Sequence, residues 1–81
     1  MTPSASHLNT LGAAQYRAGA FAEAIETLDR SDAIAVASDD GMTHRINLAF
    51  IGLALNRLGR VTEAAAALSR LRALASRVRA T

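Results

Sequence analysis

Residues 8–35 read LNTLGAAQYRAGAFAEAIETLDRSDAIA, and residues 48–75 read LAFIGLALNRLGRVTEAAAALSRLRALA. The second stretch repeats the first forty positions further along the chain, with 11 of the 28 aligned positions identical. Glycines recur at matched positions, as Gly12 with Gly52 and Gly19 with Gly59. A repeated segment of this length predicts two copies of one helix–turn–helix hairpin, the unit of a helical solenoid.

The composition predicts an all-α protein. The chain has 19 alanines, ten leucines and a single proline, and the first two residue types are the strongest helix formers. Apolar residues recur with helical spacing in four stretches, near residues 2–19, 21–36, 43–58 and 62–78. The positions expected to face inward are Leu8, Leu11, Ala14, Gln15, Ala24, Ile25, Leu28, Ser31, Leu48, Ile51, Gly52, Leu55, Ala64, Leu68, Leu71 and Ala75.

The repeated glycines fit this plan. Gly19 and Gly59 are placed to end the first helix of each hairpin in a left-handed turn. Gly12 and Gly52 lie inside a helix, where glycine costs about 1 kcal/mol relative to alanine. Their recurrence indicates that the second helix of each hairpin approaches closely, with Ala24 and Ala64 opposite them. A Ser38–Gly41 turn joins the two hairpins.

Length and composition limit the organisation of the chain. Its 81 residues fit one small domain, expected over residues 5–78, with repeats at about 5–38 and 43–78 and flexible ends at 1–4 and 79–81. The uncharged run of residues 46–56 is too short to span a membrane. There is no cysteine and no export signal at the start, so a cytoplasmic protein is expected.

The sequence contains no catalytic constellation, so neither enzymatic activity nor a cofactor is expected. His7 and His44 have no second metal ligand at helical spacing, and we expect them to be solvated or capping residues. Nucleic-acid binding is a weaker alternative. It is suggested by four arginines in the last stretch, but no turn sets apart a recognition helix there. These are Arg70, Arg72, Arg77 and Arg79.

Two segments, YRAGAFAEAIETL and LNRLGRVTEAAAAL, resemble the tetratricopeptide repeat (TPR). The family pattern is matched by Leu11, Gly12, Gly19, Phe21, Ala24 and Leu28, with the aromatic Tyr16 one place late, and by Ile51, Gly52, Leu55, Gly59, Val61, Ala64 and Leu68. The 40-residue period is longer than the family's usual 34, and leucine replaces the usual tryptophan at Leu8 and Leu48. Long-period versions resemble repeats of bacterial multidomain regulators. The resemblance implies two antiparallel hairpins stacked as a short right-handed superhelix.

The resemblance also implies a scaffold function, in which a peptide or helix of a partner protein lies in a concave groove formed by the first helix of each hairpin. By position, the groove residues are Asn9, Ala13, Tyr16, Arg17, Ala49, Leu53, Asn56 and Arg57. Ala13 and Ala49 stand where the family's carboxylate clamp has polar or basic side chains, which argues against a chaperone-tail receptor.

Self-association is the main alternative function. Leu71, Leu74 and Val78 form an apolar stripe on the last helix with no evident partner inside the chain. Charge is also divided, since residues 1–40 carry a net charge of −4 and residues 41–81 a net charge of +6. Complementary halves of this kind could attract each other between copies, which predicts a homodimer or larger assembly.

Overall fold

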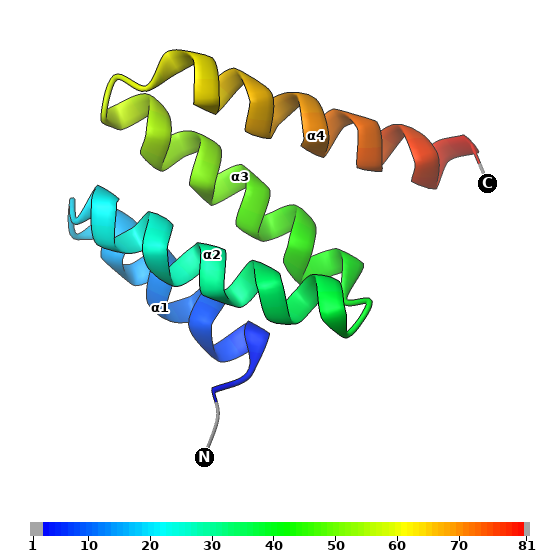
Figure 1. Cartoon of the computed structure of the whole chain (residues 1–81), viewed down its shortest axis with the longest axis horizontal. Helices are drawn as coiled ribbons and strands as arrows, with labels where there is room; N and C mark the ends of the chain where they lie inside the picture. Colours follow the sequence, from blue (N-terminus) through cyan, green and yellow to red (C-terminus); the bar gives the residue numbers. More distant parts are fainter. Residues whose placement is uncertain (1–2, 81) are drawn as a thin grey trace.

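The computed structural model describes the backbone of residues 3–80 and the side chains up to Arg77. It contains four α-helices, each packed antiparallel on the one before (Figure 1). They are α1 (Ala5–Arg17), α2 (Phe21–Ala37), α3 (Gly41–Arg57) and α4 (Val61–Ala80). The all-α fold and the four helices are therefore confirmed. The ends differ in detail, because Ser4 caps α1 by accepting from the His7 N–H, and α4 includes residues 79 and 80.

The two hairpins turn in the same way at matched positions of the repeat. Gly19 and Gly59 adopt left-handed backbone angles, with φ of 84° and 78°. The next residue in each case donates its N–H to a carbonyl five residues back, at 2.9 Å, in the pairs Ala20 to Gln15 and Arg60 to Leu55. Between the hairpins, Asp39 takes the left-handed position and Asp40 caps α3 through the Thr43 N–H. The predicted turns are confirmed.

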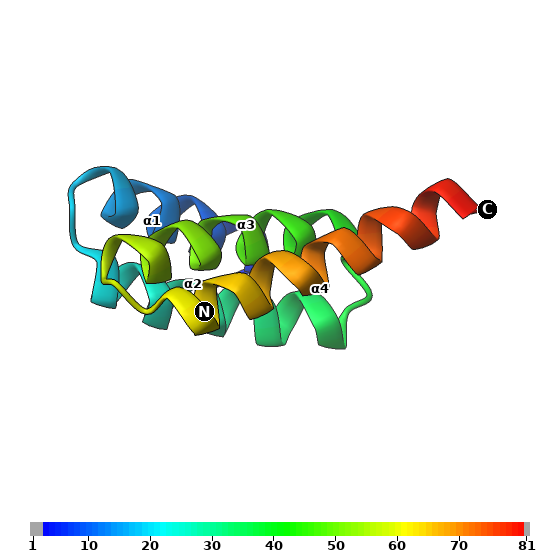
Figure 2. The same ribbon diagram turned by 90° about the horizontal axis from the view of Figure 1, so that it is seen from above.

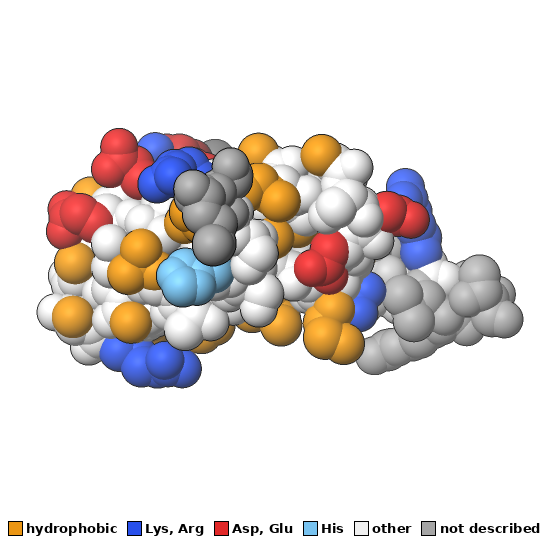
Figure 3. Space-filling model, turned by 90° about the horizontal axis from the view of Figure 1, so that it is seen from below, with side chains coloured by type: hydrophobic (Ala, Val, Ile, Leu, Met, Phe, Trp, Pro, Cys, Tyr) orange, Lys and Arg blue, Asp and Glu red, His pale blue; other side chains and the backbone are white. Residues whose placement is uncertain are grey.

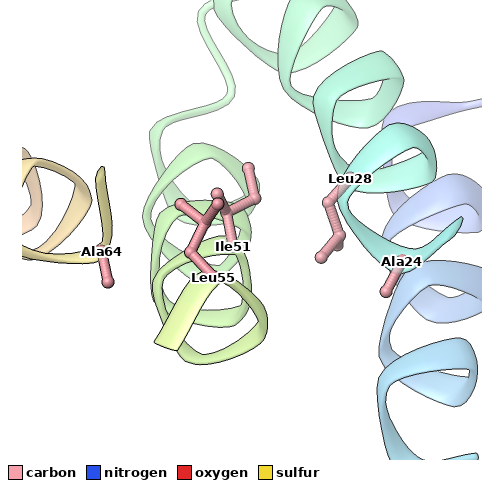
Figure 4. Packing of buried hydrophobic residues seen from close by; sticks show 5 residues of the cluster. All are labelled: Ala24, Leu28, Ile51, Leu55 and Ala64. Atoms are coloured by element: carbon pink, nitrogen blue, oxygen red, sulfur yellow. The ribbon is translucent and has the colours of Figure 1, made fainter. Parts of the chain in front are cut away.

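The helices form two thin layers. Viewed from above, α1 and α3 lie in one layer and α2 and α4 in the other (Figure 2). The helix α3 is central, since it packs against α1, α2 and α4, whereas α2 and α4 do not pack against each other over the described residues. Figure 4 shows Ile51 and Leu55 of α3 between Ala24 and Leu28 of α2 on one side and Ala64 of α4 on the other.

Most of the predicted core positions are buried, including every predicted position of α3. Three are exposed, namely Leu11 at 46%, Leu68 at 42%, and Ala14. Four others are half-buried, namely Gln15, Ile25, Leu71 and Ala75. The inward face of α1 is instead formed by Ala5, Leu8, Gly12 and Ala13. Leu11 and Leu68 lie at opposite ends of the helix stack, where no further helix of the described chain covers them.

A polar network fixes how the hairpins pack. Fully buried Asn47 of α3 accepts from the Asn9 amide at 2.8 Å and donates to Ser31 Oγ at 3.0 Å and to Asp32 Oδ1 at 3.3 Å. Ser31 in turn donates to the Ala5 carbonyl at 2.7 Å. Because buried polar groups are costly when unpaired, these bonds favour one register of α3 against α1 and α2.

The two mid-helix glycines differ in how closely they are packed. A Cβ atom on Gly12 would lie 2.6 Å from Leu28 Cγ, so the close approach inferred for this hairpin is real. A Cβ atom on Gly52 would meet its nearest neighbour, the Ala67 Cβ, at an ordinary 3.7 Å. The second hairpin is therefore looser than the first at the matching position.

Candidate functional site

Three aromatic rings cluster where α1 ends, α2 begins and α3 passes by. The Tyr16 ring lies 5.5 Å from the Phe21 ring and 5.7 Å from the Phe50 ring, in tilted and edge-on geometries. These geometries are favourable for aromatic pairs. The cluster joins three helices, and all three rings are only partly buried. Tyr16, the predicted groove residue, is thus a structural contact as well as a surface residue.

Two arginines lie over rings of this cluster. The Arg17 guanidinium carbon lies 6.0 Å from the centre of the Phe50 ring, and that of Arg57 lies 4.9 Å from the centre of the Phe21 ring. Both side chains are exposed, and neither forms a salt bridge with a described residue. Cation–π contacts hold them over the rings, so their outer N–H groups remain available to an anion.

The remaining predicted groove residues do not form one open surface with Tyr16. The Asn9 amide is bonded to Asn47, and Ala13 is only 6% exposed because α1 and α3 pack together there. Ala49 is half-buried. Leu53 and Asn56 are exposed and lie elsewhere, on the side of α3 that meets α4. The structure therefore divides the predicted groove between two places.

Leu53 and Asn56 belong to a groove of about 220 Å³ between α3 and α4. Its other lining residues are Gly52, Val61, Ala64, Ala65 and Leu68. Asn56 supplies the only polar side chain among them, and Leu53, Val61 and Leu68 are large apolar residues left exposed. We call this surface the α3/α4 groove.

The α3/α4 groove has a covered counterpart in the first hairpin. At the matched positions of the repeat, its lining residues correspond to Gly12, Ala13, Tyr16, Phe21, Ala24, Ile25 and Leu28. That face is covered by α3, through Phe50 against Tyr16 and through Ile51 and Leu55 against Ala24 and Leu28. Leu28 is 0% exposed, whereas its counterpart Leu68 is 42% exposed. The α3/α4 groove thus corresponds to the face that binds α3 in the first hairpin, but no described helix packs against it.

The apolar stripe predicted on the last helix is partly covered. Leu71 and Leu74 are half-buried, and Leu74 lines a separate depression with His44, Arg70, Ala73 and Arg77. The side chain of Val78 lies outside the described residues. The open apolar face of α4 is formed instead by Val61, Ala65 and Leu68. The repeat could have revealed this face, because its counterparts Phe21, Ile25 and Leu28 all belong to the inner side of the first hairpin.

A second cleft, of about 270 Å³, separates α2 from α4 over the buried side of α3. Its charged lining residues are Asp29, Asp32, Glu63 and Arg70. Partial burial and the neighbouring Asp32 carboxylate raise the pKa of Asp29, against the effect of Arg60. Hydrogen bonds from Arg60, at 2.9 and 2.7 Å, lower the pKa of Glu63. Arg60 thus pairs with Glu63 of α4 and also acts electrostatically on Asp29 of α2.

A histidine–aspartate pair lies beside a buried serine. His44 Nδ1 lies 2.6 Å from Asp32 Oδ1, but the nearby Ser31 hydroxyl is fully buried and bonded to the Ala5 carbonyl, so no substrate can reach it. Over residues 3–77, no three His, Asp or Glu side chains are grouped as metal ligands would be. None of the described helices is long and apolar enough to cross a membrane.

Comparison with known proteins adds no relative to this picture. No protein-family model matches the chain, and searches of curated proteins and of solved structures likewise gave no match.

Proposed function

We propose that this chain is a non-enzymatic protein-interaction module of TPR type, and that it binds an α-helix in the α3/α4 groove. The observation that carries the proposal is the comparison of the two hairpins. The face of the first hairpin holds α3, and the matching face of the second hairpin presents Leu53, Val61 and Leu68 to solvent. The TPR assignment rests on the sequence resemblance and on the 40-residue repeat of helices and turns.

The chemistry of the groove suits an amphipathic helix. Such a helix presents apolar side chains at spacings of three and four residues, which can fill the space beside Gly52 and Ala64. Full burial of an exposed large apolar side chain contributes about 1.5–3 kcal/mol. Leu53, Val61 and Leu68 are 49%, 63% and 42% exposed, so about half of that contribution remains to be gained at each of them. Asn56 at the edge can hydrogen-bond a polar side chain of the bound helix.

Photo-cross-linking tests this proposal. A benzoylphenylalanine at position 68 is compared in cell lysate with the same residue at position 36, because Val36 is also exposed but lies outside the groove. We expect position 68 to give cross-linked peptides that belong to amphipathic helices, either of another protein or of this chain. These products should disappear when Leu53→Glu is added. Equal or absent cross-linking at both positions would overturn the proposal.

The aromatic–arginine cluster supports a second binding surface, for an acidic segment. Arg17 and Arg57 are exposed and oriented by aromatic rings, and neither has a carboxylate partner among the described residues. We expect Arg17→Ala combined with Arg57→Ala to abolish capture of acidic partners from nuclease-treated lysate. Arg30→Ala, another exposed arginine outside this cluster, is the control. Unchanged capture by the double variant would exclude this second surface.

A further inference from the structure

The chain carries a candidate occupant for the α3/α4 groove on its own surface. The outer side of α1 is open and has a broad depression lined by Ser4, Ser6, His7, Thr10, Leu11 and Ala14. In α3, the counterparts of Thr10 and Leu11 are Phe50 and Ile51, the residues that contact the first hairpin. Figure 3 views the molecule from the side of the first hairpin, where hydrophobic side chains are interspersed with polar ones. The open side of α1 therefore corresponds to the side of α3 that packs against the first hairpin. No described helix packs against this side of α1.

We propose that the α3/α4 groove binds α1 of a second copy of this chain, so that copies join head to tail. Within one chain, α3 packs on α1 and α2. In the proposed arrangement, α1 of one copy packs in the same way on α3 and α4 of the next copy. The inference rests on the proposed function, since it names the helix that the groove binds. Both surfaces needed for the contact are exposed in a single chain, because 46% of Leu11 and 42% of Leu68 is accessible.

Two of the residue pairs that would meet at the junction are matched in type. Within the chain, Ile51 of α3 packs in one cluster with Leu28, and at the junction these positions become Leu11 and Leu68, again two large apolar residues. Within the chain, Phe50 packs against Tyr16. The residues at the matching positions of the junction are Thr10 and Asn56, so both partners are polar there. If position 10 were aromatic, it would leave the Asn56 amide without a hydrogen-bond partner.

One pair of charged residues is also complementary at the junction. Asp32 and Glu63 both line the cleft between α2 and α4 within the chain. At the junction their counterparts are Arg72 and Glu23 of the other copy, which have opposite signs. The acidic first half and basic second half of the chain add a longer-range attraction between the ends that meet.

The junction is expected to be weaker than the packing inside the chain. The buried network around Asn47 is not repeated, because its counterpart is His7 and the counterpart of Ser31 is Leu71. Association should therefore be reversible. Since the contact joins two different faces, it does not close on itself in a pair, and assemblies should grow with concentration.

Sedimentation of two complementary variants tests the proposal. Leu11→Glu removes the α1 side of the contact, and Leu68→Glu removes the groove side. Both residues are partly exposed, and circular dichroism checks that each variant is folded. We expect the parent chain to form assemblies larger than a dimer, and each variant alone to associate at least about tenfold more weakly, because the added charge is buried at the contact. Val36→Glu is the control, since it adds the same charge outside both faces.

Mixing the variants gives the decisive result. Leu11→Glu retains an intact groove and Leu68→Glu retains an intact α1, so the mixture should form a one-to-one dimer that grows no further. High salt should weaken this dimer, and Arg72→Glu should weaken it further. A symmetric dimer, lost with Leu68→Glu but retained with Leu11→Glu, would overturn the proposal. So would a parent chain that stays monomeric at millimolar concentration. If position 68 still cross-links a helix of another protein in that case, the proposed function stands and only the choice of occupant fails.

Discussion

The two hairpins share a plan and differ in what lies against them. Their turns use glycine at matched positions with φ of 84° and 78°, and the carbonyls of Ala24 and Ala64 lie beside the matched mid-helix glycines. Leu28 is nevertheless fully buried, whereas Leu68 remains 42% exposed. The difference arises because α3 covers the first hairpin and no described helix covers the second. Burial in this molecule therefore depends on the neighbouring hairpin as much as on the residue itself.

The largest expected effect comes from truncating these two leucines. Leu28→Ala should lower the free energy of unfolding by about 2–5 kcal/mol, because it leaves a cavity between three helices. Leu68→Ala should cost less than about 1 kcal/mol in dilute solution, because that side chain is partly solvated already. Urea denaturation of both variants measures the difference. Equal losses would contradict the description of the second hairpin as uncovered.

The glycines sharpen the same comparison. Gly12→Ala should destabilise by about 1–2 kcal/mol, since the new methyl group clashes with buried Leu28 by more than the helix gains from alanine. Gly52→Ala should stabilise the isolated chain by up to about 1 kcal/mol, since its Cβ has room. Thermal unfolding should therefore shift in opposite directions. Two shifts of the same sign would show that the hairpins are packed alike.

A third difference concerns Gln15, whose counterpart in the second hairpin is the buried Leu55. The Gln15 Oε1 atom is buried and has no hydrogen-bond donor among the described residues. Gln15→Leu should therefore raise the free energy of unfolding by about 1 kcal/mol, by removing an unpaired acceptor. Urea denaturation beside Gln15→Glu, which should destabilise, checks the direction. A loss of stability in Gln15→Leu would contradict this reading.

The smallest expected effect depends on pH. The pKa of Asp29 is higher in the folded chain than its ordinary value, so the folded state holds the proton more tightly. The parent chain therefore gains stability from this group as pH falls through the folded-state pKa, and the gain is complete below the ordinary value near 3.8. Asp29→Asn should lack this gain and should be slightly more stable at neutral pH. Unfolding midpoints at pH 7 and pH 4 measure the difference, which should shrink in acid.

The sequence predicted the helices, the turns and the repeat, because these depend on local preferences and on the spacing of apolar residues. It did not predict that Leu11 and Leu68 would be exposed. Helical periodicity identifies an apolar stripe but does not show where the next helix is missing. The network around Asn47 was also not predicted, since its bonds join three helices far apart in sequence. Likewise, the pairing of Arg57 with Phe21 depends on how α3 returns alongside the start of α2.

The central claim is that the α3/α4 groove is a packing face built to receive a helix. It is tested most directly in a longer chain made of residues 1–77, the turn residues 38–40 and then residues 1–40 again. This design keeps the 40-residue period and brings a third hairpin to the groove in the same molecule. We expect a single cooperative unfolding transition at a higher urea concentration than for the parent chain, with the increase lost on Leu68→Glu. Separate unfolding of the added hairpin, with no increase in stability and no effect of Leu68→Glu, would contradict the account.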